Sequence, residues 1–538
     1  MTRRTFVTST AAASAALTIS ACTGSSALLS DSEPVAGRLT AGRLVMIDLP
    51  GPDLDAESVA RIKRYGVTGV CLFGRNIQSE AQLRGLCESL RIVMGPDALI
   101  GIDQEGGGVI RTKTLPYPPS AMSLGAGNDA EMARQVGAAT ARGLKSMGVN
   151  WNFAPVLDVN NNASNPVIGD RSYGQDPELV ARMGLAWSEG SKSEGVATCV
   201  KHFPGHGDTL VDSHYGLPSV DKTMDELMAL ELLPFQRAAQ ADVPCVMTSH
   251  IVFPALDPDR PATLSRPILT GLLREQFGFD GVICTDAMDM QAISGRYGRG
   301  EAALMALDAG ADLVMAIAHG NGAAQDETLQ IVEEALASGR ISKRDAQAKA
   351  NRLSDLAARF PVEVDAYSAA QRSADADLME RAWSAGLTTV GDAQPIGAGQ
   401  PFTLVAARAA AGGGASDAGV TGSELVGKLS EAFDLRVALF DPGDPLGTIG
   451  EVERVHRPGT PIVIATTQRR RLGEPLTQLA QQLNPVLHLC LWNPYSALDV
   501  PAPALVSFGF RPEALDAVVA WLKGDKAATG TLPIELSV

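Results

Sequence analysis

The chain has 538 residues, which is too long for one ordinary core and predicts two to four domains. Hydrophobic residues make up 45% and charged residues 20%, which is the balance of a folded globular protein. The formal net charge of -16 argues against nucleic acid as a partner, because a nucleic-acid-binding protein needs a basic face.

Residues 1–22 have the composition of an export leader rather than of a folded domain. Arg3 and Arg4 precede an uncharged, alanine-rich stretch, as in twin-arginine signals, and ISAC at residues 19–22 resembles a lipobox. We therefore expect export and a lipid on Cys22 that anchors the protein at the outer face of the cytoplasmic membrane or cell envelope. The alternatives are an ordinary secretory signal and a short transmembrane anchor, although the apolar run is short for a membrane span.

A polar tether, residues 23–40, leads into a regular alternation of short apolar runs and stretches with helical spacing. Near-continuous apolar strands that alternate with helices indicate a parallel sheet covered on both faces. Eight such units predict a (β/α)8 TIM-type barrel over residues 41–362. An open doubly wound sheet is the alternative, but no glycine-rich phosphate fingerprint follows the first strand. The candidate strands are residues 43–49, 67–73, 98–103, 149–156, 196–203, 244–250, 281–286 and 312–317.

A second alternation follows a predicted linker at residues 363–378. Six further apolar runs are separated by helical or Gly/Pro-rich pieces, which predicts a second, smaller C-terminal α/β domain over residues 379–538. The runs are LTTVGD, FTLVAAR, RVALFD, PIVIATT, PVLHLCLW and ALVSFGF.

The six cysteines other than Cys22 show no CxxC pair and no even spacing. Several lie inside apolar, strand-like runs. We therefore expect buried thiols rather than a disulfide framework or a metal site.

Ionisable residues gather at the predicted carboxyl ends of the barrel strands, where active sites of such barrels lie. Taken singly, each would be read as a helix cap, a loop residue or a surface ion pair. Taken together at one rim, they predict an active site. They are Asp103 and Arg111 after the third strand, Arg171 after the fourth, Lys201 and His202 at the fifth, His250 at the sixth and Asp286 at the seventh.

The segment KHFPGHGDTLVDSH, residues 201–214, holds three of the seven histidines. His202 and His206 have the four-residue spacing of zinc ligands on a helix. Pro204 and Gly205 lie between them, so a helix is improbable and no metal is expected.

Two groups near this segment suit acid–base and nucleophilic chemistry. In extended backbone, Asp212 and His214 would point the same way, so the carboxylate would fix the imidazole tautomer and make a poised general acid and base. Asp286 has no adjacent carboxylate and would stay ionised near Lys201 and Arg171, as a nucleophile must.

The motifs at these strand ends resemble those of family 3 glycoside hydrolases, and more narrowly of their bacterial β-N-acetylglucosaminidase branch. KHFPGHGDT followed by DSH is the specific part, joined by IDQEGG, DRSYGQDP and GVICTDAMDM. The resemblance covers nearly all of residues 41–360, and LWNPYSALD and GTLPIELSV are similar, more weakly, to the family's second, α/β-sandwich domain. Two positions depart from the family pattern. Residues 107–111, GGVIR, lack the first arginine of GGRVxR, and Ala287 replaces an acidic residue.

This resemblance implies a retaining double displacement that needs no cofactor. Asp286 would form a covalent glycosyl-enzyme, while His214, paired with Asp212, would protonate the leaving oxygen and later activate water. Most retaining glycosidases use two carboxylates instead. The family pattern places Asp103, Arg111, Arg171, Lys201 and His202 around the first sugar, and gives His206 a role in shaping the loop.

We therefore expect an exo-acting retaining β-N-acetylglucosaminidase that removes terminal β-linked GlcNAc from peptidoglycan fragments of the GlcNAc-MurNAc type. The alternatives are a β-glucosidase or another β-glycosidase or phosphorylase of the same family, and a non-catalytic sugar-binding lipoprotein. The joint presence of Asp286, Asp212 and His214 argues against the last. The expected partner is carbohydrate, with membrane contact only through the lipid anchor and no nucleic acid.

Overall fold

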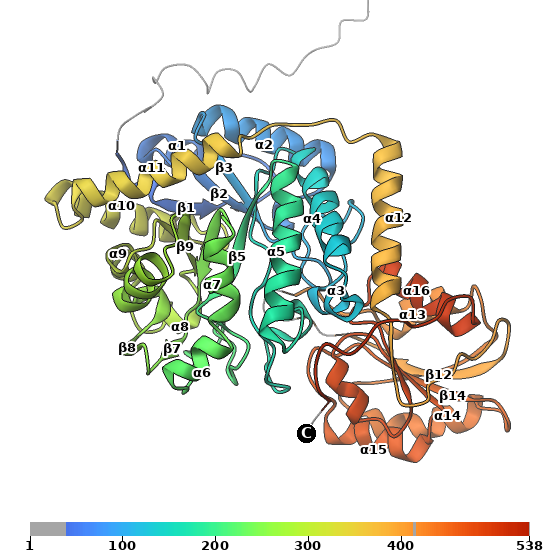
Figure 1. Ribbon diagram of the computed structural model, residues 1–538. Coiled ribbons are helices and arrows are strands. Elements are labelled where there is room, and N and C mark those ends of the chain that lie inside the picture. The colour runs from blue at the N-terminus through green and yellow to red at the C-terminus, as the bar shows by residue number, and fades with distance from the viewer. Residues whose placement is uncertain (1–38, 411, 413–415, 537–538) are drawn as a thin grey trace, which may run out of the picture. The chain divides into compact units, whose positions relative to one another are not determined.

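The computed structural model describes residues 39–410, 412 and 416–536 (Figure 1). The predicted leader, its lipidation site Cys22 and nearly all of the tether lie outside the described residues. Within the described residues, no helix has the length and apolar character that crossing a bilayer requires.

Eight parallel strands close into a barrel in the order β1-β10-β9-β6-β5-β4-β3-β2. All eight predicted strands are present, so the predicted (β/α)8 barrel is confirmed. The strands are β1 (Val45–Asp48), β2 (Gly69–Leu72), β3 (Leu99–Ile102), β4 (Trp151–Asn152), β5 (Ala197–Phe203), β6 (Cys245–Thr248), β9 (Val282–Ala287) and β10 (Leu313–Ala316).

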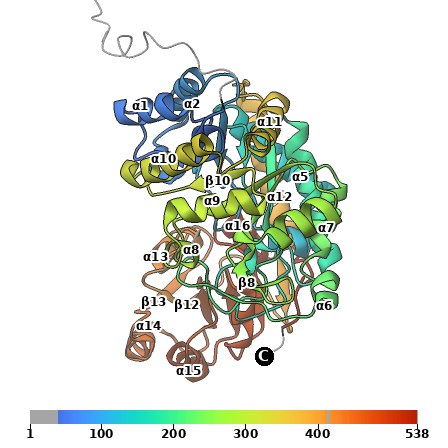
Figure 2. The same cartoon turned by 90° about the vertical axis from the view of Figure 1, so that its left-hand side faces the viewer.

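Helices lie outside these strands in both views (Figures 1 and 2). Local sequence sets their ends: the Asp55 side chain accepts the Ser58 N–H at the start of α1, and Gly66 ends that helix in the left-handed conformation. The helices are α1 (Ala56–Tyr65), α2 (Glu80–Met94), α3 (Ala121–Gly127), α4 (Ala130–Lys145), α5 (Pro177–Ser193), α6 (Met224–Ala229), α7 (Leu233–Gln240), α8 (Gln291–Ser294), α9 (Arg299–Ala309), α10 (Gly322–Ser338) and α11 (Lys343–Arg359). A small hairpin, β7 (Val252–Phe253) and β8 (Asp257–Pro261), and a wide helix over Pro267–Gln276 complete this region.

Alternate strand residues fill the barrel interior, because successive side chains point to opposite faces. The interior cluster is apolar and rich in sulfur: Met46, Cys71, Leu99, Trp151, Phe153, Ala197, Cys199, Cys245, Met247, Val282, Cys284, Leu313 and Met315. Lys201 and Asp286 follow Cys199 and Cys284 on the same faces of β5 and β9. The charged rim therefore stands directly on a packed core.

The second, smaller α/β domain is also confirmed, with a six-stranded sheet in the order β11-β16-β15-β14-β12-β13. All six predicted strands are present, and only the β11–β16 pair is antiparallel. They are β11 (Thr388–Val390), β12 (Phe402–Ala407), β13 (Leu435–Phe440), β14 (Ile462–Thr466), β15 (Leu487–Cys490) and β16 (Ala504–Val506), accompanied by α13 (Gly422–Leu429), α14 (Ile449–Val455), α15 (Glu474–Leu483) and α16 (Pro512–Lys523).

The segment between the two regions differs from the predicted linker at residues 363–378. From residue 369 onward it belongs to helix α12 (Ala369–Gly386), which contacts α3, α4 and α16. The Ser368 side chain caps the helix by accepting the Gln371 N–H. Met379, Ala382 and Trp383 form its buried face. The first turns carry mostly alanine and polar residues, and this composition has no apolar periodicity to distinguish a helix from a connector.

Candidate active site

A cavity of about 890 Å³ opens at the carboxyl ends of the barrel strands. Its volume and mixed polar and apolar lining suit a small ligand such as a sugar ring. Seven predicted site residues line it: Asp286, His214, Asp103, Arg111, Arg171, Lys201 and His202. The eighth, Asp212, stands behind His214 as its hydrogen-bond partner.

Asp286 lies near the end of β9, and its carboxylate accepts the Ala287 N–H at 2.7 Å. Burial alone would raise its pKa, but His202, His250, His214 and the Ala287 N–H together lower it. The group is therefore an ionised carboxylate at neutral pH, which a nucleophile requires.

His250, at the end of β6, holds the backbone beside Asp286. Its Nε2 donates to the Ala287 carbonyl at 3.0 Å, and its Nδ1 lies 2.8 Å from the Thr263 hydroxyl. Burial lowers the pKa of His250, so the ring is neutral. The sequence placed this histidine at the rim without a role, and the structure makes it a support for the strand end that carries Asp286.

Asp212 and His214 form a close pair, but the extended backbone predicted for them is wrong. The Tyr215 and Gly216 amides both donate to the Asp212 carbonyl, which makes the segment a turn. Asp212 Oδ1 accepts the His214 backbone N–H at 3.0 Å and its Nδ1–H at 2.6 Å. An aspartate that bonds the amide two residues on is a common turn device. The pair thus forms through a turn rather than through strand periodicity.

The electrostatics of this pair favour proton transfer. Burial would raise the pKa of Asp212, but the ring and backbone N–H groups of His214, with a contribution from Arg469, lower it to about 2. The ionised carboxylate can only accept, so it fixes the proton on Nδ1 and leaves Nε2 to face the cavity. The His214 side chain is 33% exposed, so it can exchange protons with water.

His202 forms a second pair of this kind with Asp158. Its Nδ1 lies 2.7 Å from Asp158 Oδ2, while Oδ1 accepts the backbone N–H groups of His202 at 3.1 Å and His206 at 2.7 Å. Asp158 is fully buried. Burial would raise the pKa of Asp158, but His202 and His206 lower it. No role was predicted for Asp158, because nothing in the local sequence marks it as the partner of a histidine 44 residues later.

His206 fastens the loop from within. Its Nδ1 lies 2.8 Å from the Thr209 hydroxyl, and its Nε2 lies 3.0 Å from the hydroxyl of Ser213, between Asp212 and His214. Burial lowers its pKa to about 4, so the ring is neutral. With hydroxyls at both ring nitrogens, His206 is placed to shape the loop.

A network of cations and carboxylates surrounds the space beside Asp286. Lys201 Nζ lies 2.8 Å from Asp103 and 2.6 Å from Glu105, and Arg171 makes two 2.8 Å bonds to Glu105. Arg111 lies 3.6 Å from Asp103. The role of Glu105 was not predicted. The sequence did contain a signal for it, namely a second carboxylate two residues after Asp103, just beyond β3. Glu105 compensates both cations, which leaves the more exposed Asp103 available to ligand hydroxyls.

The second domain reaches the same cavity. Ser416 and Asp417 line it, and the Asp417 amide donates to the Gly108 carbonyl at 2.9 Å. Arg469, after β14, donates to the Val167 carbonyl at 2.7 Å, and Arg171 reaches that same carbonyl at 3.2 Å. The second domain therefore supports Arg171, which lines the cavity.

Asp170 forms another link between the two regions. Trp492 Nε1, beyond β15, donates to Asp170 Oδ1 at 2.9 Å. Burial raises the pKa of Asp170 to about 6, although Trp492, Arg469 and Arg171 act in the opposite direction. This buried carboxyl therefore keeps its proton to a higher pH than an ordinary aspartate does.

Comparisons with known proteins identify the family to which the chain belongs. The chain matches the Glycosyl hydrolase family 3 N terminal domain over residues 38–356. It is 36% identical over 345 residues to "Beta-hexosaminidase A" of Pseudoalteromonas piscicida, covering 59% of this chain and 57% of that protein, so it spans little more than half of that relative. It is 38% identical over 288 residues to "Beta-hexosaminidase" of Thiobacillus denitrificans, covering 52% and 79% of the two chains. The structure of a glycoside hydrolase family 3 beta-N-acetylglucosaminidase from Paenibacillus sp. superposes with a TM-score of 0.84 at 33% identity, covering 93% and 98%.

Proposed function

The chain belongs to glycosyl hydrolase family 3, and on that premise we propose that it is an exo-acting, retaining β-N-acetylglucosaminidase. The activity is supported by relatives named as beta-hexosaminidases and by the similar beta-N-acetylglucosaminidase structure. One observation carries the proposal: an ionised carboxylate, Asp286, and a carboxylate-supported imidazole, His214, line one cavity from different segments.

In the first proposed step, the Asp286 carboxylate bonds to the anomeric carbon while the bond to the leaving oxygen breaks. His214 gives its Nε2 proton to that oxygen, and Asp212 balances the charge of the imidazolium. In the second step, neutral His214 accepts a proton from water as the water attacks the anomeric carbon and releases Asp286. This cycle restores both groups and consumes one water molecule.

The cavity lining supports recognition of one terminal sugar. Asp103 is placed to accept hydroxyl donors, while Arg111, Arg171, Lys201 and His202 supply donors for hydroxyl and acetamido oxygens. The interior side chains Phe153, Met247 and Met315 also line the cavity, and they belong to the packed core of the barrel. A cavity closed below by a packed core favours removal of a chain end over internal cleavage.

The decisive experiment is to trap the intermediate. After incubation with a slow-reacting activated β-GlcNAc substrate, peptide mass spectrometry should find one glycosyl adduct on Asp286. Asp286→Asn should carry none and should lose about 10⁴-fold or more in turnover. Asp289→Asn is the matched control, because Asp289 lines the same cavity three residues later. An adduct elsewhere, or turnover without an adduct, would contradict the mechanism. Assays with and without inorganic phosphate distinguish hydrolysis from phosphorolysis.

We also propose that the natural substrates are GlcNAc-MurNAc fragments of peptidoglycan and that the protein is exported and anchored through Cys22. The support is the sequence of residues 1–22, because a lipid-anchored protein at the outer membrane face lies close to peptidoglycan. Muropeptides should then be cleaved more efficiently than chito-oligosaccharides of equal length. Cys22→Ala should move the protein from the membrane fraction to the soluble fraction, whereas Cys490→Ala should not.

A further inference from the structure

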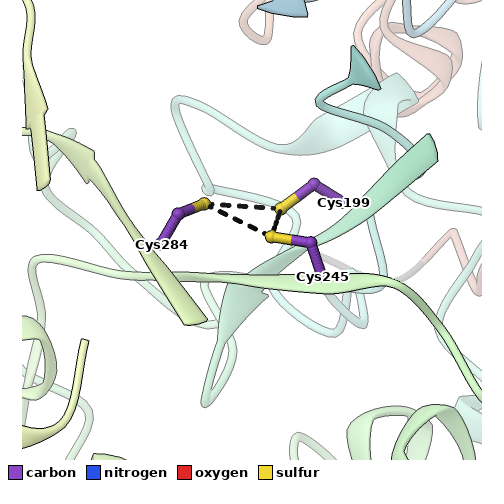
Figure 3. A group of neighbouring side chains, drawn as sticks. All are labelled: Cys199, Cys245 and Cys284. Carbon is purple, nitrogen blue, oxygen red and sulfur yellow. Dashed lines mark hydrogen bonds between the residues drawn. The ribbon is translucent and has the colours of Figure 1, made fainter. Parts of the chain in front are cut away.

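Three cysteines that lie far apart in the sequence meet inside the barrel (Figure 3). Cys199 on β5, Cys245 on β6 and Cys284 on β9 are all fully buried. Their sulfur atoms are separated by 2.8 Å (Cys199–Cys245), 3.5 Å (Cys199–Cys284) and 3.6 Å (Cys245–Cys284). Three adjacent strands thus bring three sulfur donors to one point.

Strand pairing explains this meeting. Cys199 and Cys245 are direct register partners on β5 and β6, and Cys284 pairs with Met247, two residues beyond Cys245. All three side chains belong to the interior cluster of the barrel. Their positions rest on the backbone of the closed sheet rather than on a mobile loop, so the three donors are held together before any ligand arrives.

The surroundings of this thiol group suit a soft cation. The neighbouring residues of the interior cluster are apolar or contain thioethers. The thiols contact one another only through weak S–H···S hydrogen bonds, in which Cys199 donates to Cys245 and Cys245 donates to Cys284. A thiophilic ion would replace those weak bonds with sulfur–metal bonds.

Soft side chains connect the thiol group with the active-site cavity. Cys71, Met247 and Met315 belong to the same interior cluster, and all three line the active-site cavity. Met247 stands on the same face of β6 as Cys245, two residues nearer the rim. Its thioether is a soft ligand between the cavity and the thiols.

We propose that Cys199, Cys245 and Cys284 form a three-thiolate binding site for one thiophilic metal ion in the barrel core. On binding, the S–H bonds break, sulfur–metal bonds form, and the released protons pass to solvent. No electron is transferred. Sulfur–metal distances near 2.3 Å require the sulfurs to move apart, since they stand closer together than a three-coordinate ion allows.

The site lies directly beneath the proposed catalytic groups. Cys199 precedes Lys201, and Cys284 precedes Asp286, by two residues on the same strand faces. Movement of these sulfurs would therefore displace the ends of β5 and β9. We expect the metal-loaded protein to be more stable and less active than the metal-free protein.

The probe is Cd²⁺, titrated into the full chain in the presence of a phosphine reductant and, in parallel, added during refolding from denaturant. We expect one ion per chain by native mass spectrometry, a thiolate-to-cadmium charge-transfer band in the ultraviolet, proton release in weak buffer and a higher unfolding midpoint. Refolding in the presence of Cd²⁺ lets the ion reach the thiols before the barrel closes, so slow entry into the folded core cannot mask binding.

Single Cys199→Ala, Cys245→Ala and Cys284→Ala variants should each weaken Cd²⁺ binding at least about 100-fold. Cys87→Ala is the matched control, because Cys87 is a buried thiol on α2 outside the thiol group. Alanine avoids burying a hydroxyl that lacks a partner. If a variant fails to fold, alkylation of the wild-type protein as it opens in urea, with and without Cd²⁺, gives the same information, since the bound ion should slow modification of these three buried thiols more than that of Cys87. Wild-type affinity in all three variants, or no bound ion after refolding, would overturn the proposal.

Discussion

The two aspartate–histidine pairs of the active site are built alike and placed differently. In each, the carboxylate accepts the histidine Nδ1–H, at 2.7 Å for Asp158–His202 and 2.6 Å for Asp212–His214, and also accepts the backbone N–H of that histidine. His202 stands on β5 with 7% of its side chain exposed, whereas His214 stands in a turn with 33% exposed.

The difference in side-chain exposure determines which of the two histidines can exchange protons. A general acid that becomes a general base must exchange a proton with a leaving group and then with water, so it needs an approach from solvent. His214 has that approach. His202 is packed between Asp158 and the edge of Arg171, 3.5 Å away, which suits a fixed hydrogen-bond partner for a sugar. Identical local chemistry thus supports two roles, and exposure separates them.

The largest expected effect is on the exposed pair. His214→Ala should lower kcat/KM for a natural disaccharide about 10²- to 10⁴-fold, because the poor leaving group needs its proton. A 4-nitrophenyl β-GlcNAc substrate should lose far less in the glycosylation step, since its leaving group needs no acid. His319→Ala is the control, because His319 is another rim imidazole, 79% exposed and 3.0 Å from Asp289. Equal losses on both substrates would contradict the acid role of His214.

The buried pair should matter more for folding. Asp158→Asn replaces a carboxylate that accepts three N–H groups with a side-chain amide. The NH₂ group of that amide would face an N–H group of His202 or His206, so two donors would meet. We expect a loss of about 3 to 5 kcal/mol in the free energy of unfolding, which urea denaturation measures. Asp212→Asn should lower the free energy of unfolding by only about 1 kcal/mol, because its partner, the partly exposed His214 side chain, can turn to solvent. Similar losses in the two variants would show that burial does not distinguish the pairs.

Much of the barrel and its rim was predictable from the sequence, but the local structure of the exposed pair was not. The eight barrel strands were predictable because each is a short apolar run bounded by loop residues, and barrel topology then brings Asp103, Lys201, His202 and Asp286 to one rim. The proximity of Asp212 and His214 was predictable, but the turn that contains them was not. The turn depends on hydrogen bonds from backbone N–H groups to the Asp212 carbonyl, and such bonds produce no periodic pattern in the sequence.

Contacts that cross between strands or domains were beyond sequence reasoning. The Asp158–His202 bond, the Arg469–Val167 bond and the meeting of Cys199, Cys245 and Cys284 all depend on strand register or on domain packing. No spacing rule links residues that are 302 positions apart, as Arg469 and Val167 are. Such contacts appear only when the closed barrel and its second domain are seen together.

A third buried carboxyl, that of Asp170, differs from Asp158 in the direction of its pKa shift. Both are buried, but Asp158 accepts three N–H groups and its pKa is lowered, whereas Asp170 accepts the Trp492 N–H and its pKa is raised to about 6. A raised folded-state pKa gives stability that is present below about pH 4 and lost as pH rises through 6.

Asp170→Asn removes this pH dependence while keeping an acceptor for Trp492. Relative to wild type, the variant should gain on the order of 2 kcal/mol in unfolding free energy between pH 4 and pH 7. Trp492→Phe removes a donor that lowers the pKa of Asp170, so the loss of stability with rising pH should become larger and extend to higher pH. Urea denaturation at several pH values measures both effects. A pH-independent difference between Asp170→Asn and wild type would contradict the assignment.

The smallest expected effect tests a support that the exposed pair receives from the second domain. Arg469, from the second domain, contributes to lowering the pKa of Asp212 and shares the Val167 carbonyl with Arg171. Arg469→Met should raise KM about three- to tenfold through loss of a charged hydrogen bond that helps to place Arg171. It should also move the acidic limb of the kcat/KM profile toward higher pH, because Asp212 then holds its proton more readily. Arg470→Met, at the exposed neighbouring arginine, is the matched control and should change neither. A lower kcat with no shift in the pH profile would mean that Arg469 serves only domain packing, and the two aspartate–histidine pairs would then differ in exposure alone.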